Sequence, residues 1–342
     1  MIWSRVQKQM TKRIGFCCKY INHDFTVPRD YNGTTTTVAW LNRQPKPIAE
    51  KRLWEIMIHN FASTKRVISA LGVLPVGQRM FRVGSDLLPV YTEPHWRYFW
   101  QQSDVRWFCE TSLREIGDLA RELDVRLSFH PGQFCCLASD NDDTVARSIE
   151  EFEYHVQCAK WMGYGATWHD HGFKINVHLS GRRGVEGFRN SLGLLSPEAR
   201  NLITVENDEY QSGLDDVLQL ADDVAVVMDL HHHWIHSYEL IQPTDDRVAR
   251  VVDSWRGVRP VMHYSQSRED ILVNHNCDIL PDIQQLVAQG HKRNKLRAHS
   301  DFLWNQASNR WALSFWDRYD VCVEAKFKNL ASQQLFTFSS SL

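Results

Sequence analysis

The chain has 342 residues, of which 43% are hydrophobic and 23% are charged, and its formal net charge is −2. This is the composition of a globular protein, and no apolar run is long enough to cross a bilayer, which excludes a membrane-spanning protein. The length suits one barrel-sized domain. Because the overall balance is slightly acidic, a surface for a polyanion must come from bound cations or from local basic clusters. Three such clusters are Lys51-Arg52, Arg182-Arg183 and His291 to Arg297.

The two ends of the chain and its cysteines predict the extent of the domain and its compartment. Residues 1–12 carry basic residues without an acid, and no apolar stretch follows, which indicates a short basic arm. Residues 13–330 form the expected single domain, followed by a frayed tail at 331–342. The eight cysteines contain no C-x-x-C pair and indicate reduced thiols. We therefore expect a cytoplasmic protein in a bacterium, one in the host cytoplasm if it is viral, and a nuclear or mitochondrial protein in a eukaryote.

Short apolar runs of the β type alternate along the chain with helical patterns. Buried parallel strands have this appearance. The runs lie at residues 13–18, 80–87, 125–130, 174–179, 202–207, 224–229, 260–265 and 320–326. The helical patterns lie at residues 50–71, 105–123, 144–162, 214–221 and 247–255. About eight strands in alternation with helices predict an α/β fold, the (β/α)8 TIM barrel.

Two segments exceed what a minimal barrel needs. Residues 22–47, rich in Thr, Asn and Pro, are expected to form a loop after the first strand. Residues 267–310 are expected to form an inserted loop region after strand 7. Both segments follow a strand, so both should emerge on the face where the carboxyl ends of the strands meet. In TIM barrels that face carries the active site.

Residues that can bind metals stand at or just beyond the ends of six of these runs. Any one of them, taken alone, is more often a hydrogen-bonded structural residue. Together they favour a metal cluster, because burying so many unpaired imidazoles and carboxylates costs several kcal/mol each. The candidates are His130, His178, Glu206, Asp229, His232, His263 and Glu324.

The densest of these segments runs from Asp229 to His233. In a turn at a strand end, Asp229 and His232 can diverge toward two metals, so the spacing favours these two as ligands. The other histidines of this stretch, His231, His233 and His236, are expected to surround the site or to lie on the surface.

A bridging ligand is also expected. A carboxylate can join two metals through its two oxygens, which an imidazole cannot do, so either Glu206 or Glu324 should bridge. We choose Glu206 because it ends the central strand.

Taken in order, the motifs around these residues resemble those of the ultraviolet DNA damage endonucleases. The resemblance runs from about Arg13 to Lys328 and is specific as an ordered set, whereas each motif alone is weak. The motifs are Arg13-Ile14-Gly15-Phe16, Arg82-Val83-Gly84-Ser85-Asp86, His130-Pro131-Gly132-Gln133-Phe134, Val205-Glu206-Asn207-Asp208, Asp229-x-x-His232, His263-Tyr264-Ser265, Ala298-His299-Ser300-Asp301 and Glu324-Ala325-Lys326.

The resemblance implies a metal-dependent barrel of the xylose-isomerase-like superfamily and a DNA repair endonuclease. Such an enzyme hydrolyses the phosphodiester immediately 5′ of ultraviolet photoproducts, which are pyrimidine dimers and 6-4 photoproducts, and leaves a 3′-hydroxyl and a 5′-phosphate. About three divalent ions per chain are implied, manganese before magnesium or zinc. The expected partner is damaged double-stranded DNA, and the expected state is a monomer.

By resemblance, the ligands divide among three metals. His130, His178 and Glu206 would hold the first, Glu206, Asp229, His263 and Glu324 the second, and His232 and His299 the third. Glu206, Glu324 and Lys326 would be the catalytic residues. Gln133 and Phe134 would probe the helix opposite the lesion, where an aromatic wedge suits poorly stacked photoproducts. The other expected contacts to DNA or to the lesion are Phe16, Tyr20 and Asp86.

Three positions depart from the pattern of the family. Val261 stands where relatives often carry a lysine near the metals, and Lys326 is the expected substitute. Asp86 stands at a position that can be histidine in relatives. Phe16 and Tyr20 stand at lesion-pocket positions where relatives carry other residues, so the preferred damage should differ.

Other functions on the same barrel are an apurinic-site endonuclease and a sugar isomerase, which would use the same kind of metal site. The probe-like pair Gln133 and Phe134 and the basic insertion argue against the isomerase. A damage-sensing protein without catalysis is disfavoured because Glu206 and Glu324 are both present.

Overall fold

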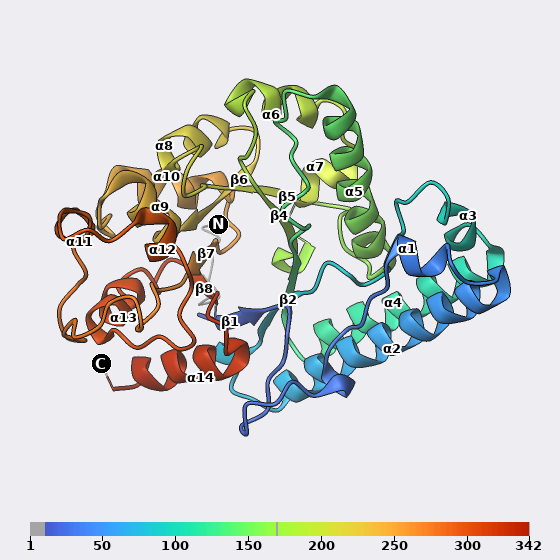
Figure 1. The fold of residues 1–342 in the computed structure, drawn as a ribbon, viewed down its shortest axis with the longest axis horizontal. Helices are drawn as coiled ribbons and strands as arrows, with labels where there is room; N and C mark the ends of the chain where they lie inside the picture. The colour runs from blue at the N-terminus through green and yellow to red at the C-terminus, as the bar shows by residue number, and fades with distance from the viewer. Residues whose placement is uncertain (1–10, 169, 342) are drawn as a thin grey trace, which may run out of the picture.

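The computed structural model describes residues 11–168 and 170–341, so most of the expected basic arm lies outside the described residues. Eight parallel strands form a closed barrel in sequence order, with β1 pairing to both β2 and β8 (Figure 1). The predicted (β/α)8 TIM barrel is thereby confirmed. The strands are β1 (Ile14–Cys17), β2 (Met80–Val83), β3 (Arg126–Phe129), β4 (Lys174–His178), β5 (Ile203–Glu206), β6 (Ala225–Asp229), β7 (Val261–Tyr264) and β8 (Asp320–Val323).

Helices between the strands surround the barrel and cover the outer face of its strands (Figure 1). They are α1 (Val38–Leu41), α2 (Lys46–Gly72), α3 (Arg97–Trp100), α4 (Ser103–Glu122), α5 (Asp142–Trp161), α6 (Gly184–Leu192), α7 (Pro197–Leu202), α8 (Leu214–Val217), α9 (Leu230–Ser237), α10 (Asp246–Ser254), α11 (Ile283–Ala288), α12 (Arg293–Leu296), α13 (Gln306–Leu313) and α14 (Lys328–Ser339). No helix among residues 11–168 and 170–341 is long and apolar enough to cross a membrane.

The segment after β1 has more regular structure than the expected loop at 22–47. Helix α1 begins after Thr37, whose side chain accepts a hydrogen bond from the backbone N–H of Trp40. Helix α2 then begins at Lys46, with a proline in its first turn. Proline is favoured there because its missing N–H would be unpaired in any case. The prolines of this segment therefore open a helix where we had expected a loop.

The inserted region after β7 carries short helices and a small core of its own. Helices α11 and α12 lie within it, and an isolated antiparallel bridge between Ser267 and His299 closes its base. Its apolar side chains pack against helix α9 and form one cluster with it. The buried members of that cluster are Trp234, Ile235, Leu272, Ile283, Leu286 and Leu296.

The expected frayed tail is wrong for most of its length. Residues 331–339 belong to α14, which packs against β1 and β8. Ala331 and Leu335 are fully buried. Serines dominate the end of the chain, but the apolar spacing just before them produces a buried helical face. The barrel domain therefore extends to Ser339.

The amino-terminal end of the barrel buries a compensated charge cluster. Both oxygens of Asp320 accept hydrogen bonds from arginines, Oδ2 from Nη1 of Arg126 at 2.7 Å and Oδ1 from Nε of Arg259 at 2.7 Å. The backbone N–H of Arg13 also donates to Oδ1 at 2.9 Å. Both oxygens of this buried carboxylate therefore have hydrogen-bond partners.

Candidate metal centre

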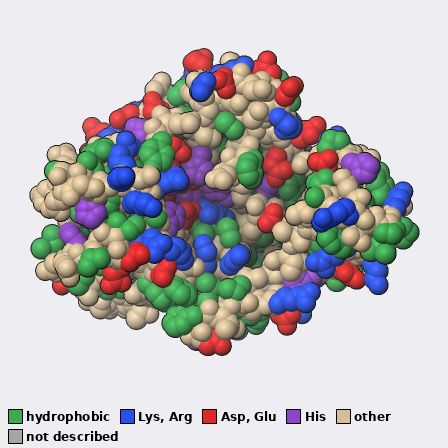
Figure 2. Space-filling model, in the orientation of Figure 1, with side chains coloured by type: hydrophobic (Ala, Val, Ile, Leu, Met, Phe, Trp, Pro, Cys, Tyr) green, Lys and Arg blue, Asp and Glu red, His purple; other side chains and the backbone are tan. Residues whose placement is uncertain are grey.

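The barrel places the predicted ligands on one rim, at the carboxyl ends of the strands. His178, Glu206 and Asp229 are the last residues of β4, β5 and β6, and His130 and Glu324 directly follow β3 and β8. Register matches His178 with Glu206 across β4 and β5, and Asp229 with His263 across β6 and β7. Because these paired residues lie at the same level of the barrel, their side chains are brought together in one cluster. Histidine side chains gather in the hollow at the centre of the molecule (Figure 2).

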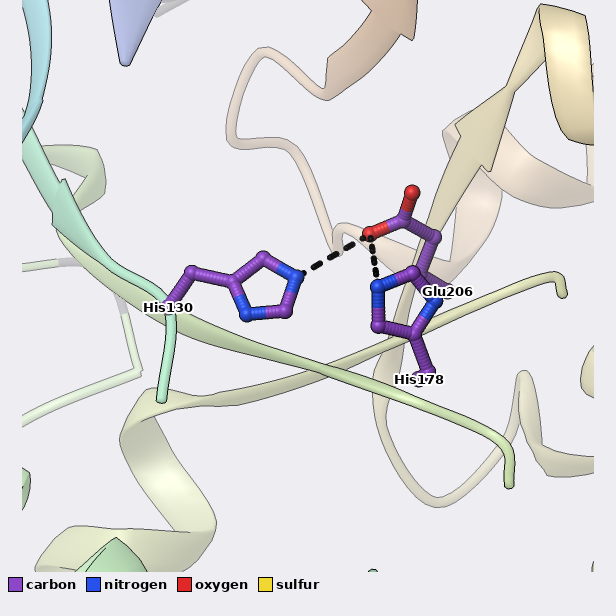
Figure 3. Close-up of side chains that lie close together, drawn as sticks. All are labelled: His130, His178 and Glu206. Carbon is purple, nitrogen blue, oxygen red and sulfur yellow. Dashed lines mark ion pairs between the residues drawn. The ribbon is translucent and has the colours of Figure 1, made fainter. Parts of the chain in front are cut away.

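The first ligand group consists of His130, His178 and Glu206. Their side chains point toward one another, and dashed lines join one oxygen of Glu206 to both rings (Figure 3). Nε2 of His130 is 3.5 Å from Oε2 of Glu206, and Nε2 of His178 is 4.0 Å from the same oxygen. All three ligand atoms lie within 4.8 Å of one another, a spacing that one metal ion can span.

The second group shares Glu206 with the first. Glu206, Asp229 and His263 offer ligand atoms within 4.8 Å of one another. Nδ1 of His263 is 3.0 Å from Oε1 of Glu206 and 3.2 Å from Oε1 of Glu324. The two oxygens of Glu206 therefore face different groups, Oε2 the first and Oε1 the second, which is the disposition of a carboxylate that can bridge two metals.

Backbone carbonyls orient three of the imidazoles. Nδ1 of His130 lies 2.8 Å from the carbonyl oxygen of Pro131, and Nδ1 of His299 lies 2.6 Å from that of Glu324. Nδ1 of His232 lies 2.9 Å from the carbonyl oxygen of Asn207. A carbonyl only accepts, so Nδ1 must carry the proton and Nε2 is left to bind a metal.

The electrostatics of the cluster fit a cationic occupant. Burial would raise the pKa of Glu206, but the imidazoles of His263 and His178 hold it well below its usual range. Burial lowers the pKa of His232, yet the carboxylates of Asp229 and Glu206 outweigh this and raise it to about 10. Oδ2 of Asp229 is buried without a hydrogen-bond partner. The buried carboxylates thus have protonated imidazoles as counter-ions, and one carboxylate oxygen has no partner. Such a set of donor atoms suits divalent cations.

Three residues to which the sequence analysis assigned no role contact this cluster. Arg82 of β2, which is buried, forms an ion pair with Oε1 of Glu324. Asn176 of β4 donates to Oε2 of Glu206. Asn207 donates to the carbonyl oxygen of Asp229 and accepts from its N–H. Arg82 and Asn176 could have been found from the sequence, because each is a polar residue that interrupts an apolar strand run.

The segment from Asp229 to His233 starts a helix directly, without the expected turn. Asp229 caps α9 by accepting a hydrogen bond from the N–H of His232 at 2.7 Å. His231 and His233 are buried, so they are not surface residues, and Nε2 of His233 lies 3.3 Å from Oε2 of Glu239. Their burial rules out the surface position that we had left open for these two histidines.

Val261, at the position of the missing lysine, and Lys326, its expected substitute, differ in exposure. Val261 begins β7 inside the barrel, packed against Cys17, Met80 and Cys322. Lys326 is exposed, and its Nζ lies 3.1 Å from Oδ1 of Asp301. The positive charge inside the barrel next to Glu324 comes from Arg82.

A cleft of about 390 Å³ opens above the cluster, and its walls include His130, Gln133, His232 and His299. Beside Gln133, the side chain of Phe134 is 85% exposed, as a ring that probes DNA requires.

The remaining residues expected at the DNA differ in placement. Asp86 is exposed, and Tyr20 is half-buried and stacks on Tyr31 with ring centroids 4.8 Å apart. Phe16 is only 1% exposed and packs on Phe81 inside the protein. A direct contact between Phe16 and a lesion is thus incompatible with its burial, and the expectation is corrected on this point.

Together, the fold and the cluster define a TIM barrel with a histidine–carboxylate centre, suited to divalent metals, at the carboxyl face of its strands. The family described as UV-endonuclease UvdE matches residues 12–341. The chain belongs to this family, which makes it a DNA repair endonuclease.

Individual relatives agree with the family. A UV DNA damage endonuclease of Bacillus mycoides (strain KBAB4) is 23% identical over 320 residues, covering 90% of this chain and 89% of its own. One of Bacillus velezensis is 26% identical over 262 residues, covering 71% and 75%. Among solved structures, that of SacUVDE aligns over 96% of this chain and 98% of its own, with a TM-score of 0.72 and 20% identity. Endonuclease IV from Thermus thermophilus aligns over 82% and 95%, with a TM-score of 0.53 and 14% identity. Both solved structures have the same fold as this chain.

Proposed function

We propose that this endonuclease hydrolyses the phosphodiester immediately 5′ of ultraviolet photoproducts in double-stranded DNA, with a divalent metal centre, and leaves a 3′-hydroxyl and a 5′-phosphate. The observation that carries the proposal is the position of Glu206, whose two oxygens face two separate ligand groups beneath an open cleft. Membership of the UV-endonuclease family supports the substrate class.

The residues of the cluster fit two shared metal positions. His130, His178 and Glu206 would hold one ion, and Glu206, Asp229, His263 and Glu324 a second; we assign manganese first, with magnesium or zinc as alternatives. When bound, such ions supply Lewis-acid activation of water and neutralise the charge of the phosphodiester. Buried surroundings strengthen each of these electrostatic effects, because little water screens them.

The chain's own side chains supply orientation and charge. Arg82 and Asn176 hold Glu324 and Glu206 in place, so the ligand oxygens do not have to reorganise when substrate arrives. Lys326 is proposed to exchange Asp301 for the scissile phosphate, because an exposed ion pair of this kind is held weakly. Asp86, exposed on the loop after β2, is proposed to bind metal or a water on the phosphate.

Recognition of the lesion is assigned to the exposed pair after β3. Phe134 would fill the space that the damaged bases leave, and Gln133 would contact the bases opposite them. Photoproducts stack poorly, so they cost less to extrude than intact bases. Tyr20, half-buried beside Tyr31, is proposed to line the pocket that receives the extruded nucleotides.

The test uses three end-labelled duplexes, which are intact, apurinic and ultraviolet-irradiated, incubated with the protein and manganese. We expect nicks only in the irradiated duplex, at the 5′ side of dipyrimidine sites, with 3′ ends that a polymerase can extend. Nicks confined to the apurinic duplex would replace the proposal by an apurinic-site endonuclease. Absence of nicks together with turnover of an aldose would replace it by a sugar isomerase.

A further inference from the structure

Glu209 is a carboxylate beside the cluster to which the sequence analysis gave no role. It lies in the loop after β5, and its side chain is only 13% exposed. It lines the same cleft as His130, His178, His232 and His299. A largely buried carboxylate in a loop requires a partner, because its desolvation is costly.

Arg297 is one partner of Glu209, and the orientation of His232 points to a second partner, a metal ion. Its Nδ1 donates to the carbonyl oxygen of Asn207, which leaves Nε2 as the metal-binding atom. Nδ1 is also the atom nearest Glu206, at 3.4 Å. Nε2 lies instead 3.6 Å from Oε2 of Glu209. A metal bound by His232 would therefore lie on the side of Glu209, away from the two groups that share Glu206.

The separation of these two atoms suits ligands of one ion. Nitrogen and oxygen ligands bind at about 2.1 Å, so two neighbours on one metal lie about 3 to 3.5 Å apart. The observed 3.6 Å between Nε2 of His232 and Oε2 of Glu209 is close to this range. It is also too long for a hydrogen bond, so this ion pair does not use a hydrogen-bonding position of either atom.

His299 brings a third donor to the same cleft. Its Nδ1 donates to the carbonyl oxygen of Glu324, so its Nε2 is also left to bind a metal. Two neutral imidazoles alone are a poor site for a divalent ion. A carboxylate in addition gives three protein ligands and open positions, the composition of catalytic sites.

The insertion after β7 holds Glu209 in place. Arg297, which follows α12, pairs with Oε1 of Glu209 at 2.5 Å, and Arg293 donates to its carbonyl oxygen at 3.0 Å. Both guanidinium groups also lie 5.3 Å from the ring centre of Tyr210. Arg297 thus occupies one oxygen of Glu209 and leaves Oε2 directed at His232, as for a ligand oriented by a neighbouring side chain.

We propose that Glu209 is a metal ligand, which completes with His232 and His299 a third metal position, and that Arg297 of the insertion positions it. The inference rests on the metal dependence of the proposed function and adds to it a ligand and a role for the basic insertion.

The test measures manganese per chain by elemental analysis after equilibrium dialysis against a series of manganese concentrations. We expect Glu209→Gln to retain one manganese fewer than the wild type, because the amide offers one neutral oxygen. Glu239→Gln, the same change outside the cleft, should match the wild type. Equal manganese content and affinity in Glu209→Gln and wild type would overturn the proposal and leave Glu209 as an ion-pair partner of Arg297.

Two further variants keep the test decisive if the amide impairs folding. Glu209→Asp should bind the full number of ions, but the last of them only at higher manganese. Arg297→Met should weaken that same ion by about 10–100-fold, the usual effect of losing the partner of a ligand. Unchanged binding curves for both would also overturn the proposal.

Nicking of irradiated duplex, measured on the same samples, separates this inference from the proposed function. A chain that does not nick but loses one manganese in Glu209→Gln refutes the function and supports the third position. A chain that nicks with wild-type manganese content in Glu209→Gln refutes only the third position.

Discussion

The two ends of the barrel both bury acidic residues, but they compensate them differently. At the amino-terminal end, Asp320 has both oxygens paired with Arg126 and Arg259. At the carboxyl end, Arg82 pairs with Glu324, but Glu206 faces only imidazoles and an amide, and Asp229 keeps one buried oxygen without a hydrogen-bond partner. Arginine is always charged, whereas imidazole exchanges its proton for a metal. One end is therefore complete as a structural unit, and the other is built for an exchangeable cation.

This contrast separates stability from activity. A change at the arginine-paired end should cost folding free energy and leave the metal centre unchanged in the molecules that remain folded. A substitution at the histidine-paired end should cost activity and leave the folding of the metal-loaded protein nearly unaffected. Each of the following experiments compares these two responses.

The largest effect is expected from Glu206→Gln, which removes the charge that both ligand groups share. We expect nicking of irradiated duplex to fall by roughly 1000-fold or more, since the centre supplies several kcal/mol of transition-state stabilisation. Thermal unfolding should stay near that of the wild type, because the amide keeps the shape of the side chain. Near-normal nicking would remove Glu206 from the bridging position.

The next effect is expected at the opposite end. Asp320→Asn should lower the free energy of unfolding by about 3–5 kcal/mol, because Arg126 and Arg259 are left buried without their counter-ion. Urea denaturation measures this change, with Asp317→Asn as control, where a surface carboxylate should matter by less than about 0.5 kcal/mol. Manganese content per folded chain should not change. A variant as stable as the wild type would show that the amino-terminal cluster contributes little.

A smaller effect is expected on the rim of the cleft, where neither charge cluster is touched. Changing Gln133 and Phe134 together to alanine should reduce the preference for irradiated over intact duplex by about 1–3 kcal/mol per lost stack. Competition binding with both duplexes measures the preference, and Trp107→Ala, an exposed ring on α4, is the matched control. Equal weakening on both duplexes would mean that Phe134 contributes general affinity and no discrimination.

The smallest effect concerns the pH dependence of the histidine-paired end. Neighbouring carboxylates, led by Asp229, outweigh burial and raise the pKa of His232 from 6.5 to about 10 in the metal-free fold. A raised pKa gives stability that is complete below pH 6.5 and is lost as the pH rises through about 10.

Thermal unfolding of chelator-treated protein should therefore decline between these pH values. Manganese replaces the proton of His232, so the loaded protein should decline less and should also lose metal in acid, where protons compete. Parallel curves with and without manganese would contradict this account of the centre.

The sequence predicted the strands and the candidate ligands, but not the side chains that hold those ligands in place. The apolar runs around His178, Glu206 and Asp229 marked both the strands and the candidate ligands, because the pattern of a strand and the residue at its end can be read from neighbouring residues. The support from Arg82 and Asn176 was not predicted, since it comes from neighbouring strands whose register is set by closure of the barrel.

By itself, the sequence determined which residues can bind metal and at which strand ends they stand, because side-chain chemistry and strand pattern do not depend on distant parts of the chain. Only the tertiary structure decided that Phe16 is buried, that residues 331–339 form a packed helix, and that Glu209 faces His232. Each of these depends on segments far apart in the sequence. Glu209 is held by Arg297 of the insertion, 88 residues later. Contacts over such separations arise only when the barrel closes and brings its loops to one face.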